Sequence, residues 1–358
     1  MGDKRQQEVE KNDRNVIVVQ RNDFNKSKLD SLFHYLEEND KLMGSIALSH
    51  NGSLIYSNAI GFADIETQTK ATNETKYRIG SISKLFTATL IMQAVEAKKL
   101  DLSNTIEGYF PTLKNADKIS IEYLLRHRSG IHNITDDDIY ETYYMNPKTR
   151  QEMLDIIAAC ESDFEPNEKG AYSNSNYILL SIILERINNS TINELVESKI
   201  SKTLKLTNTY YGSKIDLNNK ECNSYHYSEK WIKEKETDMS IPLGAGAIVS
   251  TPSDLTRFIE ALFSEQLVSQ KSLDKMLTLT AMDDMGIGYG YGILEYPVNK
   301  KGYGHTGGID GFISVLLFFP EANLSFALCT NASNYSYKEI LKTALSSFYN
   351  EPIEFVKK

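Results

Sequence analysis

The sequence predicts an α/β (α+β) fold in which one β-sheet is built from both ends of the chain and a helical domain is inserted between its two parts. Two apolar runs near the N-terminus, 43–49 and 54–62, are joined by Asn51-Gly52, a strong signal for a β-hairpin. Runs with strand character return in the C-terminal part, whereas aliphatic residues spaced three and four apart dominate the middle. We therefore expect two domains, a sheet domain and a mainly helical one, with these boundaries: 22–80 with 240–358, and 81–239.

The elements follow from these patterns in chain order. Residues 1–21 are rich in charged residues and poor in aromatic ones, so we expect a flexible tail. Periodicity of three and four predicts helices over 29–36, 82–95, 121–125, 148–160, 177–187, 192–200, 255–263 and 340–348. Strands are expected after the hairpin over 286–294, 302–307, 312–319 and 324–330. The stretch 217–235, which holds the only tryptophan, indicates an irregular surface excursion.

Composition argues against several classes of protein. The 39 basic and 48 acidic residues give a net charge of −9, which disfavours binding to nucleic acid. No stretch approaches the roughly 20 consecutive apolar residues of a transmembrane helix, so we expect no transmembrane segment. The three cysteines are widely spaced, fit no zinc pattern and are expected to be free. His127 and His132 lie in an expected loop without the His-Glu-x-x-His pattern, so we expect no metal site.

Ser81 stands at the start of the apolar segment 82–95, which is predicted to be a buried helix. A serine oxygen in the first turn lies near unpaired backbone N–H groups and the positive end of the helix dipole, which favours an anionic oxygen. Lys84 is three residues further on and so lies on the same helix face. Burial and the dipole would both lower the pKa of Lys84 towards that of a usable proton acceptor. We interpret Ser81 as a nucleophile activated by its surroundings.

The pattern Ser-x-x-Lys is weak on its own, because residues 272–275 match it as well. Such a pair is more often a helix cap followed by a solvated lysine. Lys275 has polar neighbours, whereas Lys84 stands in an apolar segment. This difference in setting favours a functional role for Lys84, and we assign none to the second copy.

Two further motifs follow along the chain. Tyr172-Ser173-Asn174 comes directly before an apolar helix, although Tyr-x-Asn also occurs at 56–58 and 144–146. His305-Thr306-Gly307-Gly308 occurs once, in a glycine-rich strand whose small residues would let a substrate backbone approach closely. Taken alone, this motif is also compatible with a simple turn between strands.

With these three motifs in this order, the sequence resembles the penicillin-recognising serine hydrolases, and specifically the class C β-lactamase-like group. That group includes D-alanyl-D-alanine carboxypeptidases, D-aminopeptidases and esterases. The resemblance covers residues 24–348 and implies an antiparallel sheet flanked by helices, with the site between the sheet and the inserted helical domain. It further implies that no cofactor is needed. An extracytoplasmic location, with any leader absent from this chain, would fit the same group.

The resemblance also assigns catalytic roles. Ser81 would attack a carbonyl carbon and become acylated. Lys84 and Tyr172 would share the role of proton acceptor, with the pKa of the Tyr172 phenol lowered by nearby cationic groups. Which of the two acts as the base stays open.

Further residues would bind the substrate. Asn174 would orient the substrate amide, and the backbone N–H groups of the nucleophile and Gly308 would form an oxyanion hole. His305 and Thr306, followed by Gly307, would line the side that faces the carboxylate or the leaving group of the substrate.

His305 departs from the group's established β-lactamases, which have a lysine at this place. A neutral imidazole is a weaker anchor for a carboxylate than an ammonium near pH 7. We therefore expect a serine hydrolase that cleaves amide or ester bonds, most of all in D-amino-acid-containing peptides, through an acyl-enzyme. A carboxylesterase with weak or no β-lactamase activity and a non-catalytic relative that binds cell-wall peptide are the alternatives. The ligand would be a small peptide, an ester or a β-lactam-like compound, and the oligomeric state stays open.

Overall fold

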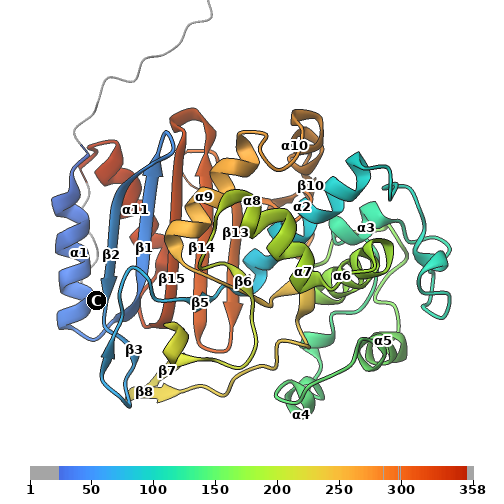
Figure 1. Cartoon of the computed structure of the whole chain (residues 1–358), viewed down its shortest axis with the longest axis horizontal. Helices are drawn as coiled ribbons and strands as arrows, with labels where there is room; N and C mark the ends of the chain where they lie inside the picture. Colours follow the sequence, from blue (N-terminus) through green and yellow to red (C-terminus); the bar gives the residue numbers. More distant parts are fainter. Residues whose placement is uncertain (1–23, 285, 297, 299, 353–358) are drawn as a thin grey trace, which may run out of the picture.

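The largest element of the fold is an eight-stranded antiparallel sheet (Figure 1). The computed structural model describes residues 24–352 except 285, 297 and 299, so the expected tail at 1–21 lies outside the described residues. The strand order is β10-β11-β12-β13-β14-β15-β1-β2. Their bounds are β1 Leu42–His50, β2 Ser53–Ile60, β10 Thr280–Ala281, β11 Gly288–Tyr289, β12 Leu294–Tyr296, β13 Gly302–Ile309, β14 Phe312–Phe319 and β15 Leu324–Ser333.

The two ends of the chain meet within this sheet. Strand β1 pairs with β15 from Leu42 opposite Ser333 to His50 opposite Leu324. The β1–β2 hairpin turns at Asn51 and Gly52, whose φ angles of 52° and 75° are the positive values that a tight hairpin turn requires. The expected hairpin and the sheet built from both termini are confirmed.

Strand β14 contributes to two cores because its side chains alternate between the two faces of the sheet. Val315 and Leu317 pack on the face covered by the terminal helices α1 (Lys26–Glu38) and α11 (Tyr337–Phe348). Leu316 and Phe318 pack on the other face, in the core to which helices α2 (Ser83–Glu96) and α9 (Pro252–Phe263) contribute. Burial on both faces explains why the strand is a nearly continuous apolar run.

Several helices lie in the chain between the two parts of the sheet. In Figure 1 most of them lie to the right of the long strands, whereas α9 lies across β14 and β15. They are α2 Ser83–Glu96, α3 Ile121–Leu125, α4 Tyr140–Tyr143, α5 Arg150–Ala159, α6 Asn174–Asn188, α7 Ile192–Val196, α8 Lys202–Leu204, α9 Pro252–Phe263 and α10 Gln270–Met276. Short helical turns join them, among them η1 Gly80–Ile82, η3 Ile134–Asp136 and η6 Leu243–Ala245. Helix α2 is buried along nearly its whole length, as its apolar sequence predicts.

Small sheets complete the fold. They are β5-β9-β6, β3-β4 and β7-β8. The strand bounds are β3 Phe62–Asp64, β4 Thr69–Lys70, β5 Tyr77–Arg78, β6 Tyr210–Tyr211, β7 Tyr225–Ser228, β8 Lys230–Lys233 and β9 Ile248–Ser250.

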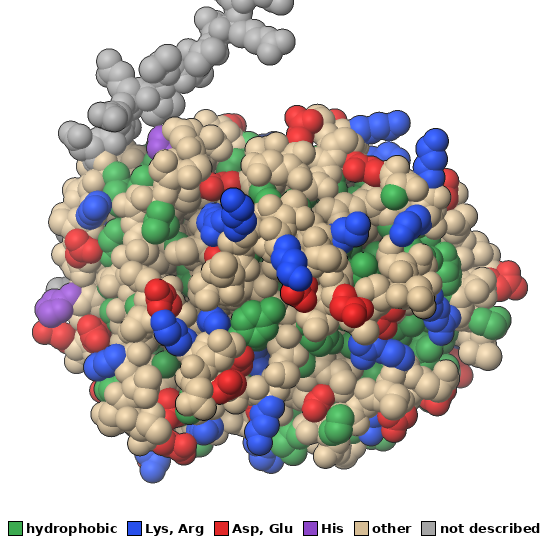
Figure 2. Space-filling model, in the orientation of Figure 1, with side chains coloured by type: hydrophobic (Ala, Val, Ile, Leu, Met, Phe, Trp, Pro, Cys, Tyr) green, Lys and Arg blue, Asp and Glu red, His purple; other side chains and the backbone are tan. Residues whose placement is uncertain are grey.

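On the face seen in Figure 2, basic and acidic side chains are interspersed.

Two expectations about local structure were wrong. The stretch interpreted as irregular contains the β7–β8 hairpin, which turns at Glu229 with a φ of 62°. No glycine or asparagine marks this turn, so the sequence carried no hairpin signal there. The single strand expected over 286–294 is two short strands, β11 and β12, because Gly292 takes a φ of 66° between them.

Candidate active site

Ser81 lies on η1, the short turn between β5 and α2, and so just before the helix rather than within its first turn. Gly80 has a φ of 50°, and a Cβ atom on it would lie 2.8 Å from the carbonyl oxygen of Gly308 on β13. A side chain there would push the two segments apart. Glycine at this position therefore lets the turn that carries Ser81 pack directly against the glycine-rich strand.

Lys84 is fully buried directly beside Ser81. Its Nζ donates hydrogen bonds to Ser81 Oγ at 3.0 Å, to Asn174 Oδ1 at 2.7 Å and to the carbonyl oxygen of Ala245 at 2.9 Å. Burial holds the pKa of Lys84 well below its ordinary value. In its neutral form this amine has two N–H donors, which suffice for Asn174 and Ala245, and its lone pair can then accept the proton of the Ser81 hydroxyl.

Tyr172 is partly buried, and Lys84 Nζ lies 4.8 Å from the centroid of its ring. Burial raises the pKa of the Tyr172 phenol above its ordinary value, although a hydrogen bond with Ser81 lowers it. The expectation of a lowered phenol pKa was wrong, because loss of hydration outweighs the favourable contact. Tyr172 therefore keeps its proton near neutral pH.

Asn174 is the first residue of α6. Its backbone N–H donates to Asn133 Oδ1 at 2.8 Å, and its Nδ2 donates to Thr135 Oγ1 at 3.0 Å. With Oδ1 bound to Lys84, both ends of the amide are held. Asn174 thus links the lysine to the turn η3.

His305 is buried, with 3% of its surface exposed. Its Nδ1 lies 2.5 Å from the carbonyl oxygen of Thr306, which can only accept, so this nitrogen carries the proton. Nε2 then accepts from the hydroxyl of Tyr289 at 3.1 Å. Burial, together with the charge of Lys84, lowers the pKa of His305 to about 3. Both ring nitrogens of this neutral imidazole bind the protein itself, which corrects the expectation that the side chain faces a substrate carboxylate.

Gly307 also differs from expectation. A Cβ atom on Gly307 would lie 2.0 Å from the carbonyl oxygen of Ile79 and 2.5 Å from Ser314 Oγ. The glycine therefore makes room for the protein's own backbone, rather than for that of a substrate.

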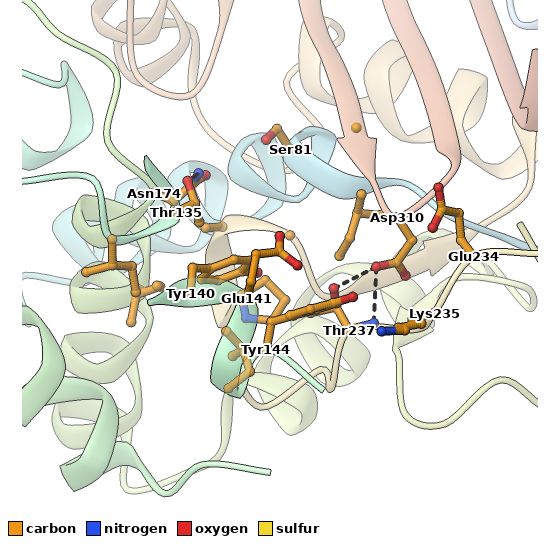
Figure 3. A pocket seen from close by; sticks show the side chains of 18 residues that line it. Ser81, Thr135, Tyr140, Glu141, Tyr144, Asn174, Glu234, Lys235, Thr237 and Asp310 are labelled. Atoms are coloured by element: carbon orange, nitrogen blue, oxygen red, sulfur yellow. Dashed lines mark hydrogen bonds between the residues drawn. The ribbon is translucent and has the colours of Figure 1, made fainter. Parts of the chain in front are cut away.

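A cavity of about 410 Å³ opens beside Ser81 (Figure 3). Ser81, Asn174 and Gly308 line it, together with residues of η3, α4 and the segment 234–246. This volume is in the usual range for sites that bind small molecules. The hydroxyl of Ser81 thus lies at a cavity that can hold a small ligand, and it is hydrogen-bonded to the buried amine of Lys84.

Comparison with known proteins identifies the family of this chain. Residues 31–346 match the family model described as Beta-lactamase. The chain belongs to the β-lactamase family, and it is a serine hydrolase. The family resemblance and the fold class predicted from the sequence are confirmed.

The chain shares 25% sequence identity or less with the following two relatives and one solved structure. The chain is 23% identical over 356 residues to penicillin-binding protein 4* of Bacillus subtilis, covering 92% of this chain and 78% of the relative. It is 25% identical over 321 residues to a teichoic acid D-alanine hydrolase of Staphylococcus aureus, covering 88% and 78%. The crystal structure of D-amino acid amidase from Ochrobactrum anthropi SV3 complexed with D-phenylalanine has the same fold, with a TM-score of 0.80, 23% identity and coverage of 91% and 100%.

His127 is a site residue that sequence reasoning missed, since it was considered only as a metal ligand. The side chain is fully buried, and the backbone has a φ of 56°. Its carbonyl oxygen accepts from the Ala171 N–H at 3.0 Å, and its Nδ1 accepts from the Ser173 N–H at 3.1 Å. Burial, followed by the positive charge of Lys84, lowers its pKa well below the ordinary value. His127 thus binds the residues on both sides of Tyr172.

The second Ser-x-x-Lys pattern has a different setting. Ser272 Oγ donates to Glu96 Oε1 at 2.5 Å, and Lys275 is exposed. The hydrogen bond of Ser272 ties α10 to the end of α2, and neither residue is among those that line the cavity.

The three cysteines are unpaired, and Cys222 and Cys329 are buried. In the part of the chain that the structure describes, no cluster of three or more histidine, cysteine or acidic side chains could hold a metal ion. Among the same residues, no helix has the length and apolar character needed to cross a membrane.

Proposed function

We propose that the chain hydrolyses amide or ester bonds of D-amino-acid-containing substrates through an acyl-enzyme on Ser81. The observation that carries this proposal is the 3.0 Å hydrogen bond between Lys84 Nζ and Ser81 Oγ at the edge of the cavity. A nucleophile needs an adjacent group that can take its proton, and a buried amine with a lowered pKa is such a group.

In the acylation step, Ser81 Oγ forms a bond with the carbonyl carbon while its proton moves to Lys84 Nζ. The backbone N–H groups of Ser81 and Gly308 would stabilise the negative charge on the carbonyl oxygen. Collapse of this intermediate breaks the bond to the leaving amine or alcohol, which takes up a proton. Water then attacks the ester and releases the acid, which restores Ser81.

Tyr172 would act in these steps as a proton donor and relay. Because burial raises the pKa of its phenol, it enters the cycle protonated and hydrogen-bonded to Ser81. It can pass its proton to the leaving group and receive the one held by Lys84. Lys84 is therefore the base in this proposal, and Asn174 holds its amine in place.

The substrate class is supported by the names of the relatives. One acts on the D-alanine of teichoic acid, and another is a D-amino acid amidase. Because His305 is neutral and buried, it offers no fixed positive charge to the carboxylate of a β-lactam or of a peptide C-terminus. A carboxylesterase remains the second candidate.

The relatives' names also support action outside the cytoplasm on material of the cell envelope.

The test is covalent labelling of the whole chain with a fluorophosphonate or a fluorescent penicillin, followed by mass analysis of the peptide that contains Ser81. We expect an adduct on wild-type protein and none on Ser81→Ala. Ser272→Ala, in the second Ser-x-x-Lys pattern, is the matched control and should label like wild type. Absence of an adduct on wild type, or full hydrolytic activity in Ser81→Ala, would contradict the proposal. Comparing a D-alanyl peptide with a short-chain nitrophenyl ester separates peptidase from esterase.

A further inference from the structure

Glu141 on α4 points its carboxylate into the catalytic cavity, across from Ser81 (Figure 3). In the described part of the chain this carboxylate forms no hydrogen bond or ion pair. The other two carboxylates in the lining have partners. Asp310 accepts from Arg78 at 3.0 Å and from Thr237 Oγ1 at 2.6 Å. Glu234 lies 2.7 Å from His226 Nδ1, so Glu141 is the carboxylate left available for a ligand.

The negative charges of Glu141, Glu234 and Asp310 all affect the region of the cavity around Tyr144. The pKa of the Tyr144 phenol is raised by burial and then by Glu141, Asp310 and Glu234. Arg78 offsets only part of this negative field, because its single positive charge is shared between Asp310 and Glu236. The cavity on this side therefore favours a positive charge.

Aromatic rings stand beside Glu141. Tyr140 and Tyr144 line the cavity and stack with ring centroids 5.6 Å apart and planes 16° apart. A carboxylate next to the faces of tyrosine rings is a suitable environment for an ammonium group, since ion pairing and cation–π attraction add.

The cavity lining has fewer positively charged side chains, which would bind a substrate carboxylate, than negatively charged ones. Among the described residues that line the cavity, the one cation is Lys235, which lies beside Thr237 and away from Asn174 (Figure 3). Lys84 is occupied by three acceptors, and His305 has both ring nitrogens bound.

We propose that the cavity selects substrates whose acyl group carries a free ammonium, and that Glu141 is the residue that determines this specificity. The substrates would be amides or esters of D-amino acids with an unblocked amino group, rather than N-acylated peptides recognised by their C-terminal carboxylate. This inference rests on the proposed acyl-enzyme at Ser81 and names the acyl group that it accepts.

The experiment compares D-alanine p-nitroanilide with N-acetyl-D-alanine p-nitroanilide on the full chain. We expect wild type to prefer the free amine by about tenfold or more in kcat/KM, the factor that corresponds to one well-formed charge pair. Glu141→Gln should lose most of this preference through a raised KM for the free amine. Glu107→Gln removes the same charge at an exposed position outside the cavity lining and should keep the preference.

Equal hydrolysis of the two substrates by wild type, or an unchanged preference in Glu141→Gln, would overturn the inference. If the acetylated substrate is hydrolysed equally well and Ser81 is still labelled by a fluorophosphonate, the proposed function survives without the ammonium selectivity. If neither substrate is hydrolysed and no label attaches, both proposals are wrong.

Discussion

The imidazole ring of His127 packs against the phenol ring of Tyr172, with ring centroids 4.4 Å apart and planes 35° apart. The same histidine accepts hydrogen bonds from the backbone of Ala171 and Ser173. Tyr172 is thus held through both of its chain neighbours and through its ring by one buried residue.

His127→Ala should lower kcat and also reduce the free energy of unfolding by about 2–4 kcal/mol, because it removes a buried acceptor and leaves a cavity. His127→Asn keeps an oxygen acceptor near the position of Nδ1 and should recover part of both losses. Steady-state kinetics and urea denaturation check this prediction. Unchanged kcat in His127→Ala would show that the histidine does not position Tyr172.

Lys84→Met should reduce kcat by about 10²–10⁴-fold, the usual contribution of a general base. Methionine fills a similar volume without the amine, so the fold should persist and can be verified by circular dichroism. Lys275→Met changes the exposed lysine of the second Ser-x-x-Lys pattern and should have wild-type activity. Activity of Lys84→Met within tenfold of wild type would rule out the lysine as the base.

The stability of the protein should fall as the pH drops from about 6.5 towards about 3, by at most about 1.4 kcal/mol per pH unit for each buried histidine. The folded-state pKa of His305 is lowered to about 3, so the unfolded chain binds more protons than the folded chain within this window. Acid therefore favours unfolding.

Denaturant titrations at several pH values measure this slope. His305→Gln should flatten it in part, since His127 has a lowered pKa as well. An identical slope in His305→Gln would mean that His305 does not contribute.

Gly307→Ala should destabilise the protein by about 3 kcal/mol, the upper part of the usual range for overpacking. The added methyl group would meet the carbonyl oxygen of Ile79, which lies just before the turn that carries Ser81. Activity should fall with stability because this turn must move. Gly108→Ala is the matched control, since a Cβ atom there meets nothing within 4 Å. Equal melting temperatures of the two variants would contradict the prediction.

Much of the fold could be predicted because its signals are local. Asn51-Gly52 specifies a hairpin by its backbone preferences, and the apolar run at 312–319 specifies a strand buried on both faces. The β7–β8 hairpin escaped prediction because Glu229, not glycine, takes the positive φ at its turn. Tyr225 and Trp231 of this hairpin pack against Met43 and Ala332, which are far away in the sequence.

The proximity of Ser81 and Lys84 was determined by the sequence itself, since a spacing of three residues in a helical turn brings the two side chains together. Only the tertiary structure decided the chemistry around them. Burial raises the pKa of Tyr172 and makes His305 neutral, and the packing of the chain places Glu141 in the lining of the same cavity as Ser81. Each of these effects depends on segments far apart in the chain. The pKa of a side chain depends on how far packing removes it from water and on which charges packing brings near it. The sequence alone therefore predicted that Ser81 and Lys84 are neighbours, but not the protonation states of the groups around them.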